Sequence, residues 1–297
     1  MVFRRIGIEK MPLSRKIFDA VGVYPILDHY YEPLFKKSRI KKSLREDRIL
    51  PGLDFNEEEQ LAILEKFDYN EELLKYPLEK PSDYSRPLFY YNNPNFKSGD
   101  AEYLYNVIRL YKPSKIVEIG SGFSTLIAHE ANLKNEREDG NFTCEHICIE
   151  PYQRNWLEDT GVSVIRQPVE QIEVEWFKRL NQNDILFIDS SHIIRPQGDV
   201  LFEYLHILPV LNSGVMIHIH DIFTPKDYPA DWLFKKVRLW NEQYLLEAFL
   251  SFNHQFKIIG ALNFLAHHYT NELSTKCPIF SREITLREPG SMWLKKI

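Results

Sequence analysis

Residues 115–125 constrain the fold of this chain more than any other stretch. They read Lys-Ile-Val-Glu-Ile-Gly-Ser-Gly-Phe-Ser-Thr, a short β-branched run followed by two glycines and the start of a helical pattern. This order predicts a strand that passes through a tight turn into a helix. Because glycine has no Cβ and the first amides of a helix are free, acceptor groups of a small molecule can approach the backbone here.

From residue 98 onward, predicted strands and helices alternate. The predicted strands span 115–119, 146–150, 162–166, 184–189, 214–220, 256–264 and 291–296. The predicted helices span 124–134, 172–180, 197–208 and 230–252, and one more begins at Ser98 or Asp100 and ends before Pro113. Strands separated by helices predict right-handed βαβ units. No clear helix separates the last two strands, so the expected fold is α/β, Rossmann-like and doubly wound, with a mostly parallel sheet and an antiparallel C-terminal edge.

Residues 1–97 have a different composition, rich in aromatic residues and proline. Proline at this spacing favours extended chain, so we expect an N-terminal arm that wraps the domain formed by residues 98–297. One short helix is expected at 56–67, with Asn56 as its N-cap. The long connection at 265–290 shows no clear periodicity and is predicted to be a functional or mobile loop.

Composition excludes several classes of protein. Of 297 residues, 44% are hydrophobic, and 37 Lys and Arg stand against 42 Asp and Glu, so a folded protein without a nucleic-acid partner is expected. The cysteines form no Cys-x-x-Cys pair and are interpreted as core thiols. Neither a signal peptide nor a transmembrane segment is expected, and a cytoplasmic location is the corresponding prediction. The cysteines are Cys144, Cys148 and Cys277.

Acidic residues stand at the carboxyl ends of the predicted strands. Open α/β sheets bind their ligands at these ends. Glu150 closes the second strand and is well placed to accept both hydroxyls of a ribose. Asp189 with His192 follows the fourth strand, and His220 with Asp221 follows the fifth. Since these two strands are expected to be neighbours, their polar residues should converge.

Four motifs resemble, in order and spacing, those of class I S-adenosylmethionine (SAM)-dependent methyltransferases, over about residues 98–297. They are Val117-Glu-Ile-Gly-Ser-Gly-Phe-Ser124, Ile149-Glu-Pro151, Ile185-Leu-Phe-Ile-Asp189 and Gly214-Val-Met-Ile-His-Ile-His-Asp221. The chain looks closest to the bacterial macrocin O-methyltransferase-like group. The alternative is a nicotinamide oxidoreductase. Its motif has a third glycine and an acid closer to the glycines than Glu150 is.

The resemblance implies that SAM is the cofactor, with its methionine part at the glycine turn, its ribose at Glu150 and its adenine near Val169 and Glu170. The implied cofactor residues are Glu118, Gly120, Ser121, Gly122, Ser124, Thr125, Glu150, Glu170 and Asp189. The chain departs from the pattern at Ser124, where many members have a third glycine, and in the longer loop at 132–141.

Asp189, His192, His220 and Asp221 are the predicted catalytic residues. Related metal-dependent O-methyltransferases place acids at positions like Asp189 and Asp221 around a magnesium ion, so these two are the candidate metal ligands. The alternative is metal-free general-base catalysis by a histidine. His218 is interpreted as a core residue, on the argument that His218 and His220 lie on alternating faces of one strand.

The expected activity is O-methylation of a hydroxyl on a small molecule or glycan. Two other hypotheses are a hydroxylase-like enzyme, with iron on Asp189, His192 and His220, and a non-catalytic cofactor-binding module. The arm and residues 265–290 are expected to shape the acceptor side. A basic run at 36–48 is usually a solvated helix face, and docking to an anionic lipid or glycan, a peripheral membrane contact, is its functional alternative.

Overall fold

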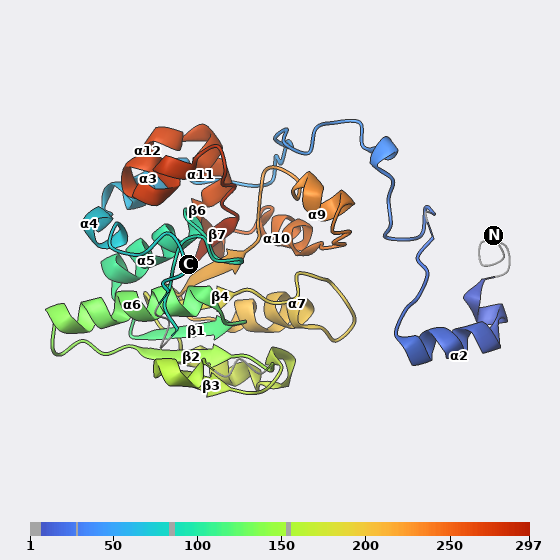
Figure 1. Cartoon of the computed structure of the whole chain (residues 1–297), viewed down its shortest axis with the longest axis horizontal. Helices are drawn as coiled ribbons and strands as arrows, with labels where there is room; N and C mark the ends of the chain where they lie inside the picture. The colour runs from blue at the N-terminus through green and yellow to red at the C-terminus, as the bar shows by residue number, and fades with distance from the viewer. Residues whose placement is uncertain (1–6, 28, 83–86, 153–155) are drawn as a thin grey trace. The chain divides into compact units, whose positions relative to one another are not determined.

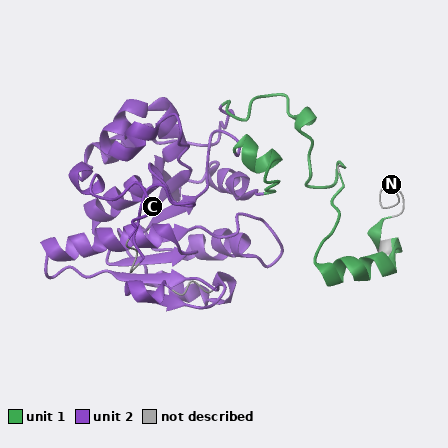
Figure 2. Ribbon diagram, in the orientation of Figure 1, with its two compact units in different colours: residues 1–46, 229–239 green, residues 47–228, 240–297 purple. Residues whose placement is uncertain are grey.

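The computed structural model describes residues 7–27, 29–82, 87–152 and 156–297. Its contacts divide the chain into two compact units, residues 1–46 with 229–239 and residues 47–228 with 240–297 (Figure 2). Residues 47–97 belong to the larger unit. Among the described helices, none is long and apolar enough to cross a membrane.

The larger unit is built on a seven-stranded sheet with the order β3-β2-β1-β4-β5-β7-β6 (Figure 1). The strands are β1 Lys115–Ile119, β2 Glu145–Ile149, β3 Ser163–Ile165, β4 Ile185–Ile188, β5 Met216–His220, β6 Phe256–Ala261 and β7 Ser291–Lys296. The first five strands pair in parallel, whereas β7 pairs antiparallel with both β5 and β6. The predicted fold is confirmed. Strand order reverses between β1 and β4, where such sheets bind ligands.

Both faces of the sheet are buried. In β4, Ile185 and Phe187 contribute to one hydrophobic core, and Leu186 and Ile188 contribute to the other. Side chains alternate across a strand, so an uninterrupted apolar run is what a central parallel strand covered on both faces requires.

Helices cover these two faces (Figure 1). The larger unit contains α3 Glu57–Glu65, α4 Asn70–Leu73, α5 Asp100–Tyr111, α6 Phe123–Glu138, α7 Asp199–Phe202, α8 Leu208–Val210, α10 Glu242–Leu250, α11 Leu262–His268, α12 Thr270–Lys276 and α13 Pro278–Glu283. It also contains the 3₁₀-helices η3 Glu158–Thr160, η4 Val169–Gln171 and η5 Val174–Arg179, and the π-helix η6 Glu203–Ile207. The smaller unit contains η1 Ile8–Lys10, α2 Pro12–Val21, η2 Lys37–Arg39 and α9 Ala230–Phe234.

Two predictions near the C-terminus are wrong. Strand β6 ends at Ala261, where its pairing with Met292 ends, and Leu262 begins a helix. The connection at 265–290 contains helices, since α11 continues into it and α12 and α13 follow. Each of these helices is seven residues or shorter, too short for its apolar spacing to stand out in the sequence.

Three predicted helices also differ from the structure. Residues 230–252 form two helices, α9 and α10, which belong to different units. Residues 197–208 fold as α7, η6 and the start of α8, and the predicted helix at 172–180 is the 3₁₀-helix η5. The periods of these helix types differ from that of an α-helix by less than a residue per turn, and segments of three to six residues are too short for the sequence to distinguish them.

Asn56 occupies its expected N-cap position in α3, but the residue that caps α5 is neither Ser98 nor Asp100. Gly99 occupies the N-cap of α5, and its amide donates to the Glu102 carboxylate. Asn56 occupies the N-cap position of α3 but makes no side-chain cap, because its amide group donates to Glu59 and to the Ile258 carbonyl.

A buried ion pair fastens residues 47–97 to the sheet-covering helices. Arg109 of α5 is 2% exposed and donates twice to the Glu72 carboxylate, at 2.9 and 3.0 Å. The Tyr105 hydroxyl donates to the same carboxylate at 2.6 Å. Such bidentate, buried pairing explains why this segment belongs to the larger unit.

Candidate active site

A cavity of about 830 Å³ lies at the carboxyl ends of β1, β2 and β4. Its lining includes Gly120, Glu150, Glu170 and Asp189, four of the predicted cofactor residues. A cavity of this size at a switch point of strand order can enclose a nucleoside-sized ligand. The remaining predicted cofactor residues, Glu118, Ser121, Gly122, Ser124 and Thr125, lie in or directly beneath the turn that leads into α6.

Gly120 is required by the backbone. Its φ is 79°, and a Cβ built on it would lie 2.0 Å from the Asp189 carbonyl oxygen. The Gly120 amide donates to the Ile149 carbonyl, and the Asp189 amide donates to the Ile119 carbonyl. The ends of three adjacent strands therefore meet at this glycine with no space for a side chain.

Glu118 supports the turn from below. Its carboxylate accepts a hydrogen bond from the Thr125 hydroxyl at 2.5 Å and lies 3.1 Å from His146 Nε2. The Thr125 hydroxyl in turn accepts a hydrogen bond from the Gly122 amide. Glu118 is fully buried, and its contacts hold the turn between β1 and α6 in place.

Glu150 connects the end of β2 to the same turn. Its carboxylate accepts hydrogen bonds from the Ser121 amide at 3.3 Å and from the Tyr152 amide at 3.0 Å. Only 5% of the residue is exposed, and it lines the cavity. The Ser121 hydroxyl is buried and finds no hydrogen-bond partner among the described residues.

The predicted catalytic residues converge next to this cavity. His192 Nε2 lies 3.2 Å from an Asp189 oxygen and 3.5 Å from an Asp221 oxygen, and one ligand atom from each residue lies within 4.8 Å of the others. The Asp189 side chain is 34% exposed, so the group faces accessible space. The backbones of His192 and Asp221 have φ of 60° and 58°, a left-handed conformation that non-glycine residues rarely adopt and that is frequent at functional sites.

Glu242, at the start of α10, completes the cluster and was not predicted. Its fully buried carboxylate lies 2.7 Å from His192 Nδ1 and accepts a hydrogen bond from the Tyr204 hydroxyl at 3.2 Å. Glu203, adjacent to Tyr204, accepts a hydrogen bond from Ser190. Glu203 and Tyr204 belong to the π-helix η6, and a helix of this type often lies at a functional site.

Three carboxylates therefore surround one imidazole. Burial acts to lower the pKa of His192, but Asp189, Glu242 and Asp221 together raise it well above its ordinary value. Burial also acts to raise the pKa of Asp189, yet the neighbouring histidines hold it below its usual range. The surplus of negative charge favours a proton or a metal cation between these groups.

His218 and His220 lie on the same face of β5, because residues two apart in a strand point the same way. Their rings are stacked with centroids 5.5 Å apart, so the argument that they lie on alternating faces is wrong. His218 is nevertheless a core residue. It is fully buried, its ring stacks on that of Phe187 with centroids 4.1 Å apart, and burial lowers its pKa. His220 Nε2 lies 3.6 Å from Asp221, at the edge of the cluster.

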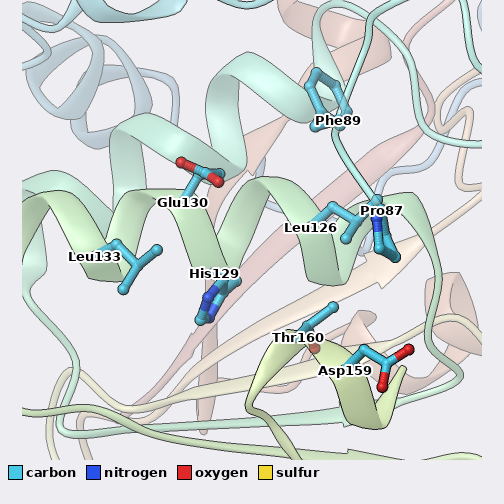
Figure 3. Close-up of a pocket in the computed structure, with 8 residues that line it drawn as sticks. All are labelled: Pro87, Phe89, Leu126, His129, Glu130, Leu133, Asp159 and Thr160. Atoms are coloured by element: carbon cyan, nitrogen blue, oxygen red, sulfur yellow. The ribbon is translucent and has the colours of Figure 1, made fainter. Parts of the chain in front are cut away.

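Two other features lie outside the cluster of acids and histidines. Glu118, His146 and Cys148 lie close enough to hold a metal, but burial raises the pKa of the Cys148 thiol and Glu118 already bonds Thr125. A cavity of about 90 Å³ lies against α6, lined by residues such as Leu126, His129 and Asp159 (Figure 3). It shares no lining residue with the large cavity and has room for little more than water.

Comparison with known proteins locates this site within a family. Residues 117–222 match the family model of a methyltransferase domain. An uncharacterised protein of Archaeoglobus fulgidus is 34% identical over 168 residues, which cover 53% of this chain and 74% of that protein.

Solved structures resemble the chain only distantly. The O-methyltransferase TomG from Streptomyces achromogenes, in complex with SAM, has 11% identity and a TM-score of 0.40, covering 79% of this chain and 89% of that one. An O-methyltransferase from Bacillus cereus, in complex with SAH, has 11% identity and a TM-score of 0.35, covering 66% and 82%. Likeness at this level carries no argument about chemistry. The chain belongs to one family with the archaeal protein, and its residues 117–222 are similar to a methyltransferase domain.

Proposed function

We propose that this protein is a SAM-dependent methyltransferase that binds SAM in the large cavity. The observation that carries the proposal is that every residue lining this cavity lies within the matched methyltransferase domain. Its volume, about 830 Å³, lies in the range of small-molecule sites. SAM supplies an electrophilic methyl group, so the protein has to position the cofactor and the acceptor and remove a proton from the acceptor.

The cofactor roles follow the geometry of the turn. The buried Glu150 carboxylate is the proposed acceptor for the ribose hydroxyls, and Glu170 with Val169 the proposed adenine side. Ser121 and the free amides at the start of α6 are the proposed partners of the methionine carboxylate. Glu118 and Thr125 hold the turn, and Ser124 is buried in the first helical turn.

Asp189, His192 and Asp221 fit a divalent cation. Two carboxylates and one imidazole nitrogen are a suitable ligand set for Mg²⁺ or Mn²⁺. His192 Nδ1 contacts Glu242, which leaves Nε2 directed at the two aspartates, the arrangement usual for a metal-binding histidine. Such an ion would acidify an acceptor hydroxyl. Without it, His192 is the proposed general base, and because the surrounding carboxylates raise its pKa it accepts a proton only at a pH above that raised value.

The acceptor is proposed to be a hydroxyl of a small molecule or glycan, as in the macrocin O-methyltransferase-like group. Two segments that we expect to shape its site meet beside the cluster. The Phe96 ring lies 5.0 Å from that of His220, and the Gly290 amide donates to Asp100 while its carbonyl accepts from Ile222. The division into an arm at 1–97 and a catalytic domain at 98–297 remains a prediction about function.

The test is calorimetry of SAM and its demethylated product, S-adenosylhomocysteine, with Glu150→Ala. Losing a pair of charge-assisted hydrogen bonds costs about 1.5–3 kcal/mol, so affinity should fall about tenfold or more. The matched control is Glu175→Ala, which removes an exposed acid of η5 and should leave affinity unchanged. Absence of SAM binding by the wild type, or unchanged affinity in a folded Glu150→Ala variant, contradicts the proposal.

An iron-dependent hydroxylase is not favoured. It would use Asp189, His192 and His220, whereas the atoms that converge come from Asp189, His192 and Asp221. A non-catalytic module would bind SAM without methylating any acceptor, and product analysis separates these hypotheses.

A further inference from the structure

Helix α2 of the smaller unit is amphipathic and has no core to cover. Leu13, Ile17 and Val21 follow one another at intervals of four residues and are 74%, 55% and 62% exposed. All ten residues of this helix are described, and none of them is buried. The opposite face has an ion pair between Arg15 and Asp19. An apolar stripe of this kind normally packs against the core of its own protein, a partner or a membrane.

The chain after this helix is aromatic and then strongly basic. Tyr30 and Tyr31 are 84% and 83% exposed. The segment 33–45 contains six basic residues and no acidic one, and all six are exposed. They are Lys36, Lys37, Arg39, Lys41, Lys42 and Arg45.

Charge is distributed unevenly over the whole sequence. Residues 1–46 contain 11 Lys and Arg against 5 Asp and Glu, although the full chain has 37 against 42. The basic excess is therefore local and sits on the unit that carries the exposed helix.

These features select among possible partners for the apolar stripe. A second copy of the chain would bring one basic segment against another, and like charges oppose that pairing. A neutral apolar surface on a partner would bind the stripe but would not attract the six basic side chains. An anionic lipid surface accommodates both, because apolar side chains enter the boundary between headgroups and acyl chains while lysines and arginines remain at the headgroups.

We propose that residues 12–45 dock the protein on an anionic lipid surface. Leu13, Ile17 and Val21 enter the boundary, and the exposed tyrosines lie at headgroup level, where amphipathic rings are favoured. The segment 36–45 supplies the electrostatic attraction. The inference does not depend on the proposed methyltransferase activity.

The experiment is co-sedimentation of the full chain with vesicles. Vesicles of equal parts phosphatidylcholine and phosphatidylglycerol should bind the protein, pure phosphatidylcholine should not, and added salt should release it. Lys41→Gln with Lys42→Gln, and separately Leu13→Gln with Ile17→Gln, should each weaken binding about tenfold or more.

The matched control is Lys66→Gln with Lys75→Gln, the same change of charge at two exposed lysines of the larger unit, which should bind like the wild type. Equal binding to neutral and anionic vesicles, or no binding to either, overturns the proposal. Concentration-dependent dimers that the Leu13 and Ile17 substitutions abolish would instead assign the stripe to a second copy.

Discussion

The two halves of the site are built differently. The glycine turn between β1 and α6 is held mainly by backbone contacts to the ends of β2 and β4 and by the Glu118, Thr125 and Glu150 side chains. The acid and histidine cluster at the ends of β4 and β5 is held by side chains, and Glu242 comes from 50 residues further along the chain than His192. A substitution in the glycine turn should therefore lower the stability of the fold. Substitutions in the cluster should instead change metal binding one charged group at a time. Four sets of substitutions test this difference.

Gly120→Ala should have the largest effect. The new methyl group would meet the Asp189 carbonyl at 2.0 Å, in a backbone conformation with positive φ. Strain and overpacking together should lower the free energy of unfolding by about 3 kcal/mol or more. Chemical denaturation measures it. Gly140→Ala, where a Cβ meets nothing within 4 Å, is the control, and equal stability of the two variants would show that the turn tolerates a side chain.

Removing the two carboxylates proposed as metal ligands should weaken metal binding strongly and leave the turn intact. We expect Asp189→Asn with Asp221→Asn to weaken Mn²⁺ binding more than about 100-fold, measured by electron paramagnetic resonance, since both lost groups point at His192 Nε2. SAM affinity should change far less. Once an acceptor is known, chelator should stop turnover and added metal should restore it. Full turnover in chelator would establish metal-free base catalysis.

Glu242 should act through His192. Glu242→Gln keeps a side chain that can accept from His192 Nδ1, whereas Glu242→Ala does not. We expect the alanine variant to lose about 10-fold to 100-fold in Mn²⁺ affinity and the glutamine variant to lose less. NMR of the His192 ring nitrogens should show the change of tautomer or orientation. Equal Mn²⁺ affinity in the wild type and both variants would make Glu242 a packing residue only.

His218→Leu should have the smallest effect. The His218 ring is buried against Phe187, its Nδ1 has no hydrogen-bond partner among the described residues, and its Nε2 makes a long contact of 3.4 Å with His220 Nδ1, so a leucine of similar volume removes little. The expected loss of stability is below about 1.5 kcal/mol, with unchanged Mn²⁺ binding. Thermal unfolding and the same resonance experiment check both points, and a loss of metal binding would place His218 in the cluster.

Much of the site was predictable because parallel strands end at one edge. That rule places Gly120, Glu150, Asp189 and Asp221 together from the sequence, and the structure brings them to one cavity and its neighbouring cluster. Glu242 was not predictable, because it begins a helix that the sequence pattern merges with the preceding segment. The short helices between β6 and β7 were missed because none is long enough to show a period.

The sequence alone determined the succession of the seven strands and of the longer helices α5 and α6, with a glycine turn between β1 and α6. These depend on local sterics and on apolar spacing, which are properties of the chain itself. Only the tertiary structure decided that Glu118 supports the turn, that Glu242 orients His192, and that α2 exposes its apolar stripe. Each of these depends on which distant side chains a group meets after folding, and burial sets both its hydrogen bonds and its charge.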